Sequence, residues 1–161
     1  MHILLTRPLD DCVEMILKFK SLGHQVSHIP LLKIEEVKSE EINDSGYSGI
    51  IFTSANAIKF LNLSKLNKNL KCFCVGNATE KIARLKGFQN TISADGNVLN
   101  LKELIYQNYE SKDKNLLYIS GETISSDLDN QLSKDGFNIK RIINYRTCLL
   151  YTSDAADDDH C

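Results

Sequence analysis

The chain has 161 residues, of which 42% are hydrophobic and 25% charged, and its formal net charge is −2. These values are typical of a soluble protein with one ordinary core, or one domain and part of another. No apolar run approaches the roughly 18 residues that a membrane span needs, and the opening residues are too weakly apolar for a signal peptide. We therefore expect a cytoplasmic protein. The basic residues form no stripe, which argues against nucleic acid as a partner.

The chain opens with a predicted β-α-β segment. Residues 2–6 have the pattern of a buried strand, and residues 9–22 that of an amphipathic helix ended by Gly23. A second strand covers residues 25–29 and stops at Pro30.

Residues 31–37 are extended and weakly periodic, and a polar stretch follows at 38–48. Such a connection is long for a compact α/β domain. It is either a polar excursion of one domain or a bridge that carries the chain into a second domain, and periodicity alone leaves both open.

From residue 49 onward, strands and helices alternate. Strands are predicted at 49–52, 71–75, 90–93, 115–120 and 138–145. The helices between them are predicted at 54–61, 77–86, 98–109 and 125–134. This βα repeat predicts the α/β class, with parallel sheets and helices on their faces.

Four of the predicted strands end in small or polar residues that lead into a helix, at 6–8, 53–56, 76–79 and 121–123. Ligands of parallel sheets bind beyond the carboxyl ends of the strands, and helix starts offer free N–H groups to anions. Ser, Thr and Asn at such positions are also ordinary helix caps. These residues therefore fit two interpretations, a rim that binds carboxylate or phosphate groups and simple helix capping.

The sequence lacks several motifs that would indicate a cofactor or a nucleophile. It has no G-x-G-x-x-G, no P-loop and no G-x-S-x-G. The histidines form no metal-ligand pattern, and the pair Cys72 and Cys74 is expected to be two buried free thiols. We expect no metal and no organic cofactor.

Several segments, in order along the chain, resemble the uroporphyrinogen-III synthase family. Residues 49–58 (GIIFTSANAI) resemble its G-I-I-F-T-S-x-N-A-V segment, and residues 75–79 (VGNAT) resemble its V-G-x-x-T segment. Further matches are LLTRP at 4–8, PLLKI at 30–34, Gly96-Asn97 before a Leu-rich helix, and Tyr145-Arg146-Thr147.

The resemblance implies two α/β domains joined by a two-stranded bridge. The first domain would open with residues 1–30, and residues 31–38 would form one bridging strand. A flavodoxin-like domain would be inserted at 39–144, and residues 145–161 would return along the bridge. In the family, a further third of the chain then completes the first domain.

The last 14 residues, 148–161, change abruptly to acidic and small residues. A natural disordered tail is one interpretation. The other is translated foreign sequence joined to a truncated gene, which would leave the chain a fragment with weak activity or none.

The resemblance also implies a reaction. The substrate would be hydroxymethylbilane, a linear tetrapyrrole with eight carboxylates, and the product uroporphyrinogen III, formed with loss of water and inversion of the terminal ring. Such an enzyme works mainly by holding a folded substrate. It needs no cofactor and would be a monomer.

By position in these motifs, Tyr145 is the candidate to assist departure of the hydroxyl group, although it could equally be a packing aromatic. Arg7 and Arg146 could each clamp a carboxylate or lie on the surface. The predicted substrate-binding residues are Thr6, Arg7, Ser54, Asn56, Asn77, Thr79, Gly121 and Arg146. A non-catalytic α/β module that binds a small anion is the alternative.

Overall fold

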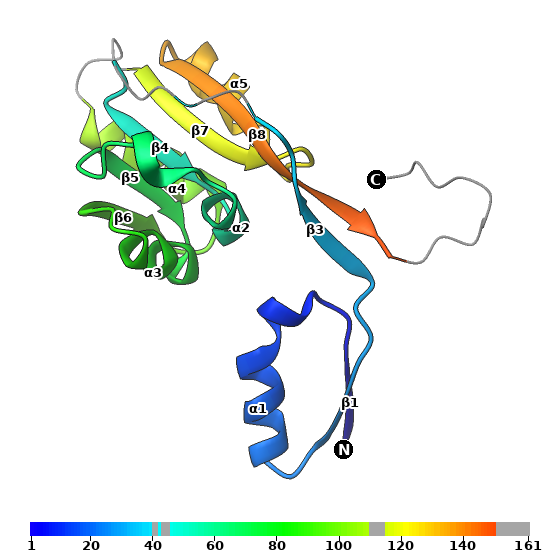
Figure 1. The fold of residues 1–161 in the computed structure, drawn as a ribbon. Coiled ribbons are helices and arrows are strands. Elements are labelled where there is room, and N and C mark those ends of the chain that lie inside the picture. The colour runs from blue at the N-terminus through cyan, green and yellow to red at the C-terminus, as the bar shows by residue number, and fades with distance from the viewer. Residues whose placement is uncertain (40–41, 43–45, 110–114, 151–161) are drawn as a thin grey trace, which may run out of the picture. The chain divides into compact units, whose positions relative to one another are not determined.

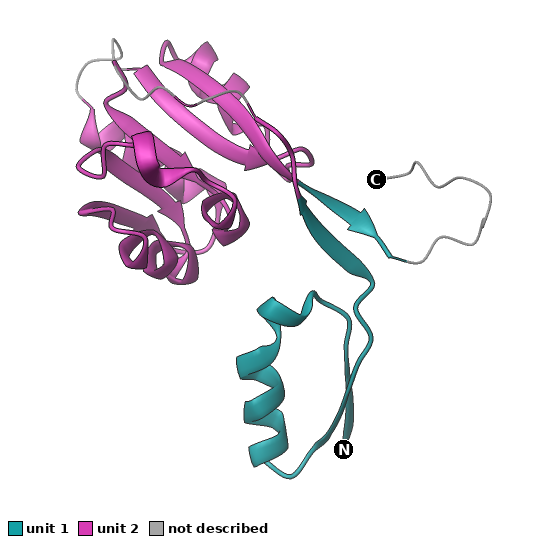
Figure 2. Cartoon of the chain, viewed as in Figure 1, with its two compact units in different colours: residues 1–35, 146–161 teal, residues 36–145 magenta. Residues whose placement is uncertain are grey.

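The computed structural model describes residues 1–39, 42, 46–109 and 115–150 (Figure 1). The chain divides into two compact units (Figure 2), Met1–Glu35 with Arg146–Cys161 as unit 1, and Glu36–Tyr145 as unit 2. The predicted domain boundaries stay a prediction. The acidic tail from residue 151 onward and part of the polar stretch at 38–48 lie outside the described residues. No described helix is long and apolar enough to cross a membrane.

Unit 1 opens with the predicted β-α-β segment. Strand β1 (His2–Leu5) pairs in parallel with β2 (Gln25–His28), and α1 (Val13–Ser21) connects them. The helix was predicted from residue 9, but a 3₁₀ turn, η1 (Leu9–Asp11), occupies its first residues because the Cys12 N–H bonds to the Leu9 carbonyl. None of the residues in α1 is buried.

In the described part of unit 2, five parallel strands have the order β8-β7-β4-β5-β6. Their bounds are β4 (Gly49–Phe52), β5 (Lys71–Val75), β6 (Asn90–Ala94), β7 (Asn115–Gly121) and β8 (Asn138–Leu149). The predicted α/β class is confirmed. The order is the 3-2-1-4-5 type of doubly wound sheet rather than the 2-1-3-4-5 flavodoxin type, because the chain returns from the β6 edge to the free side of β4.

Four helices cover the two faces of this sheet. Residues of α2 (Ala55–Lys59) and α3 (Asn77–Leu85) pack in one core with Ile50 and Phe52. Residues of α4 (Val98–Asn108) and α5 (Leu128–Lys134) pack in the other with Ile51. Successive strand residues face opposite sides, so a central strand of a parallel sheet is apolar throughout. This is why all four residues of β4 are buried.

Strand β3 (Leu32–Glu36) lies beside β8 at the edge of the sheet. The Val37 N–H donates to the Asn144 carbonyl, and the Leu150 N–H donates to the Leu31 carbonyl. Because one partner's number rises as the other's falls, the two segments are antiparallel. β8 is therefore one strand that continues to Leu149, beyond the predicted end at residue 145.

Cys72 and Cys74 are free and fully buried, with their sulfur atoms 3.7 Å apart. The neighbouring Cys74 thiol and burial raise the pKa of Cys72. The prediction of two buried free thiols is confirmed, and both pack as small hydrophobic residues.

Candidate functional site

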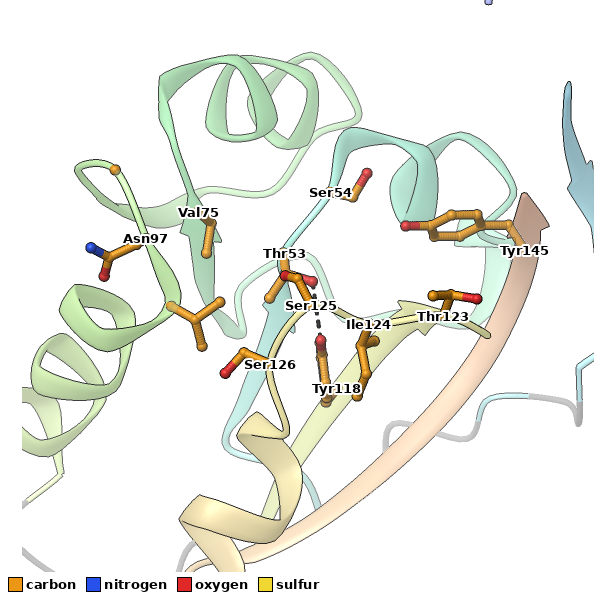
Figure 3. A pocket seen from close by; sticks show the side chains of 12 residues that line it. Thr53, Ser54, Val75, Asn97, Tyr118, Thr123, Ile124, Ser125, Ser126 and Tyr145 are labelled. Carbon is orange, nitrogen blue, oxygen red and sulfur yellow. Dashed lines mark hydrogen bonds between the residues drawn. The ribbon is translucent and has the colours of Figure 1, made fainter. Parts of the chain in front are cut away.

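A cavity of about 510 Å³ lies in unit 2 at the carboxyl ends of its parallel strands. Twelve described residues line it (Figure 3). They lie on, or shortly after, strands β4 to β8: Thr53, Ser54, Val75, Gly96, Asn97, Val98, Tyr118, Thr123, Ile124, Ser125, Ser126 and Tyr145. Strands β4 and β7 are neighbours here, although β5 and β6 separate them in the chain. Such a switch in strand order is where open α/β sheets bind ligands.

The floor of the cavity is a pair of hydroxyl groups, one from β7 and one from the residue that follows its neighbour β4. Thr53 Oγ1 and Tyr118 Oη lie 3.1 Å apart, and the dashed line in Figure 3 marks this hydrogen bond. Tyr118 is only 1% exposed. Burial raises the pKa of its hydroxyl, opposed by the bond to Thr53. The hydroxyl therefore stays protonated at neutral pH and keeps a proton to donate.

The segment 123–126 adds three further hydroxyl groups. A helix was predicted from Ser125, but α5 begins at Leu128, after the N-cap residue Asp127. The loop that remains between β7 and α5 brings Thr123, Ser125 and Ser126 to the cavity (Figure 3). The prediction placed the helix start too early because Ser and Asp are both good capping residues.

Two capping residues lie at the rim. The Ser54 hydroxyl accepts a hydrogen bond from the Asn56 N–H at 3.2 Å. Asn97 Oδ1 accepts from the N–H groups of Leu99 and Asn100, at 2.9 and 3.1 Å. Each oxygen thus serves as a helix cap, while the Ser54 O–H and the Asn97 amide N–H₂ remain donors for a ligand.

Tyr145 borders the cavity from β8, and its ring lies against Gly121 of β7. A Cβ atom added to Gly121 would be 2.6 Å from Tyr145 Cζ and 2.9 Å from its Oη. Glycine at position 121 is therefore what allows the ring to lie there. Within the described part of the chain, the Tyr145 hydroxyl makes no hydrogen bond, so its proton is available to a ligand.

None of the twelve lining side chains is charged. The described cavity wall offers hydroxyl and amide donors, with apolar surface from Val75, Val98 and Ile124. Neutral donors of this kind can bind carboxylate groups and hold a flexible ligand in one conformation without a strong acid or base.

Of the predicted site residues, Ser54 and Tyr145 line this cavity, and Gly121 lies against the Tyr145 ring. Asn56, Asn77 and Thr79 do not line the cavity. Asn56 is half-buried, and Thr79 is buried on α3. Asn77 is exposed and accepts a hydrogen bond from Ser93. Their proposed contacts with a substrate stay predictions.

The other predicted residues belong to unit 1. Thr6 and Arg7 are exposed, and the Arg7 guanidinium lies 3.7 Å from Asp11. Arg146 Nη2 donates to Glu35 Oε2 at 3.3 Å. Hydrogen bonds from Lys33 and Arg146 lower the pKa of Glu35. A carboxylate that binds Arg146 would therefore compete with Glu35.

Glu80 on α3 is the centre of a polar network away from the cavity. It accepts hydrogen bonds from Ser93 at 2.5 Å and from Arg84 at 2.7 Å, and both lower its pKa. A carboxyl with a lowered folded pKa stabilises the fold above its unfolded pKa of about 4.3, and that stability is lost as pH falls through the folded value.

We predict that Glu80→Gln lowers stability at pH 7 and that the difference from wild type closes as pH falls below about 4. Urea unfolding at pH 7 and pH 3 checks this. Ser93→Ala should change stability in the same direction by less. A difference between Glu80→Gln and wild type that is equal at both pH values would contradict the assignment.

Two residues at or near the site are absent from the sequence prediction, whereas Thr53 falls within the predicted rim at 53–56. Tyr118 lies on β7, whose apolar pattern hides its hydroxyl group. Arg141 donates to Ser120 Oγ and to the Gly121 carbonyl, both at 2.8 Å. The scarcity of arginine, four in the whole chain, is the signal that could have found it.

Fold and cavity together define a doubly wound α/β protein with a cavity at the switch point of its sheet. The family profile described as "Uroporphyrinogen-III synthase HemD" matches residues 13–159. The chain belongs to the uroporphyrinogen-III synthase family, whose members take part in tetrapyrrole biosynthesis. A comparison with curated proteins gives no match.

Two solved structures illustrate the likeness in fold. A mutant uroporphyrinogen III synthase from Thermus thermophilus superposes with a TM-score of 0.63 at 15% identity. The uroporphyrinogen-III synthetase from Helicobacter pylori gives 0.63 at 19% identity. The chain is covered to 91% and 94%, and spans 62% and 63% of those two proteins.

Proposed function

We propose that this chain acts in the synthesis of uroporphyrinogen III, by closing hydroxymethylbilane with loss of water and inversion of the terminal pyrrole ring. The activity would be that of a lyase, carried out in the cytoplasm by a monomer. Membership of the family supports the reaction class. Because the chain spans less than two thirds of the solved relatives, the complete reaction is part of the proposal.

The observation that carries the proposal is the hydroxyl-lined cavity with Tyr145 at its border. The substrate carries eight carboxylates on a flexible chain, and uncatalysed closure gives the uninverted isomer. The catalyst must therefore fold the chain so that the terminal ring attacks through its substituted carbon. Positioning of this kind needs many directed hydrogen bonds rather than one strong acid.

In this proposal, neutral donors of the cavity hold carboxylates of the substrate. Ser54 and Asn97 would donate at the rim, and Tyr118 at the floor. Tyr145 would donate its proton to the departing hydroxyl group, which is general acid catalysis. Asn56, Asn77, Thr79, Thr6, Arg7 and Arg146 are proposed as further contacts, and Gly121 as the residue that makes room for Tyr145.

The test combines binding and turnover. The chain, labelled for NMR, is titrated anaerobically with uroporphyrinogen III, and the ratio of isomers formed from hydroxymethylbilane is measured by chromatography. We expect shifts in residues 53–54, 96–98 and 123–126, and more isomer III than forms without protein.

Acetate at the same carboxylate concentration is the control ligand. Equal shifts with acetate and no gain in isomer III would favour the alternative, a module that binds small anions without catalysis. Absence of shifts with the product, together with an unchanged isomer ratio, would overturn the proposal.

A further inference from the structure

The alignment of β7 with β8 changes by one residue at the border of the cavity. Up to Ser120 the strands pair residue for residue, with Ser120 opposite Ile143. The next pair is Gly121 with Tyr145. Asn144 is thus an extra residue in β8, and the irregularity is a β-bulge, in which two residues of one strand oppose one of its partner.

This extra residue decides which face of the sheet Tyr145 occupies. Side chains alternate along a strand, so a shift of one residue moves a side chain to the opposite face. Ile142 belongs to the core under α2 and α3, and Ile139 to the core under α4 and α5. Strict alternation would give Tyr145 the same face as Ile139, yet its ring packs with the core of α2 and α3.

The bulge is held on the β7 side by Arg141. Its Nε donates to Ser120 Oγ at 2.8 Å, and its Nη2 donates to the carbonyls of Gly121 at 2.8 Å and Glu122 at 3.0 Å. These three acceptors span the residues where the register changes. The guanidinium group presents its donors in a rigid fork, so one side chain fixes the path of the backbone at this point.

Asn144 holds the bulge from the other side. Its side chain is 1% exposed, and Nδ2 donates to the Ala57 carbonyl at 2.7 Å. Ala57 lies in α2, the helix that Ser54 caps. The Asn144 carbonyl accepts from Val37 N–H at 3.0 Å, and the Tyr145 carbonyl accepts from Glu122 N–H at 2.9 Å. Asn144 is therefore tied to Val37 and to α2, and the residue after it is tied to Glu122, which follows β7.

We propose that Arg141 is a positioning residue: by fixing the bulge at Asn144, it holds the Tyr145 ring against Gly121 and at the cavity. The part of this inference that concerns catalysis rests on the proposed function, whereas the placement of the ring does not. Arg141 is not among the described residues that line the cavity, so in this inference it acts through the strands that it holds.

The first readout needs no substrate. In the NMR spectrum of the whole chain, a nuclear Overhauser effect should join the Tyr145 ring to the Gly121 Hα protons. Arg141→Gln should abolish this contact while methyl signals of the two cores stay in place. Arg84→Gln is the matched control, because Arg84 also bonds a backbone carbonyl, that of Thr91, but on α3; it should keep the contact.

A loss of dispersion in the methyl spectrum of Arg141→Gln would mean that this variant is unfolded. Arg141→Lys is then used instead, because lysine retains the positive charge but lacks the forked donors of the guanidinium group. A Tyr145–Gly121 contact that survives in the folded variant would overturn the inference, as would its absence from the wild-type chain.

The second readout is turnover. Arg141→Gln should lower kcat for isomer III about tenfold with little change in KM, because misplacing a reacting group by about 1 Å can cost up to a hundredfold. If the ring contact is lost in Arg141→Gln but the wild-type chain itself forms no isomer III, the proposed function is refuted and the placement of the ring by Arg141 still holds. Lost ring contact with unchanged kcat would overturn the catalytic part of this inference.

Discussion

Gly121→Ala is expected to leave the fold intact and to remove most of the activity. The new Cβ would lie 2.6 Å from Tyr145 Cζ and 2.8 Å from Cε2, which is too close for either atom to stay. The ring is the end of a rotatable side chain, so it can swing away. We expect a loss of about 1 kcal/mol in the free energy of unfolding, the low end for overpacking.

The displaced ring can no longer present its hydroxyl to the substrate. Formation of isomer III should therefore fall about a hundredfold, the size of effect that misplacement of a catalytic group can have. Chromatography of the products and urea unfolding of the same preparation measure the two effects side by side.

Gly49→Ala provides a matched control in the same sheet. A Cβ there would lie 2.5 Å from Tyr109 Oη, 3.1 Å from a Leu116 methyl group and 3.2 Å from the Lys71 carbonyl. The Lys71 carbonyl belongs to the backbone and cannot rotate away from the new Cβ. We therefore expect Gly49→Ala to lose more stability than Gly121→Ala, up to about 3 kcal/mol, and to keep normal turnover per folded molecule. Normal activity in Gly121→Ala would show that the place of the Tyr145 ring is unimportant.

Local sequence pattern is enough to predict the sheet and its helices. The run of apolar residues in β4 and the glycines after the helices indicate buried parallel strands joined by helices. Pattern does not give the order of the strands, because each βα unit carries the same signal wherever it sits. The class was therefore predictable, whereas the order β8-β7-β4-β5-β6 was not.

The cavity was predicted only in part, and the reason lies in the third dimension. Ser54 and Tyr145 occur in short motifs, so they could be named from the sequence. Tyr118 and Thr53 meet only because β7 lies beside β4, and the bulge at Asn144 depends on the register between β7 and β8. Pairing between distant segments leaves no periodic trace in a single sequence.

Tyr145→Phe is expected to abolish most of the turnover at almost no cost in stability. The variant keeps the ring against Gly121 and removes only the hydroxyl oxygen. Within the described residues that oxygen makes no hydrogen bond, so its loss should change the free energy of unfolding by less than about 0.5 kcal/mol. If Tyr145 protonates the leaving hydroxyl group, kcat for isomer III should fall about a hundredfold, the lower range for general acid catalysis.

Tyr118→Phe is the control for Tyr145→Phe. It removes a different hydroxyl group from the cavity, so it distinguishes proton donation by Tyr145 from the general effect of losing one cavity hydroxyl. Tyr118 bonds Thr53 in the wild-type chain, so its loss should lower stability by about 1 kcal/mol, the usual value for one hydrogen bond. Its proposed role is binding, so its main kinetic effect should be a higher KM. If Tyr118→Phe and Tyr145→Phe both raise KM equally and leave kcat unchanged, Tyr145 is one binding group among several. A lowered kcat for Tyr145→Phe alone assigns the proton to Tyr145, because packing, cavity volume and fold would then be the same as in the wild-type chain.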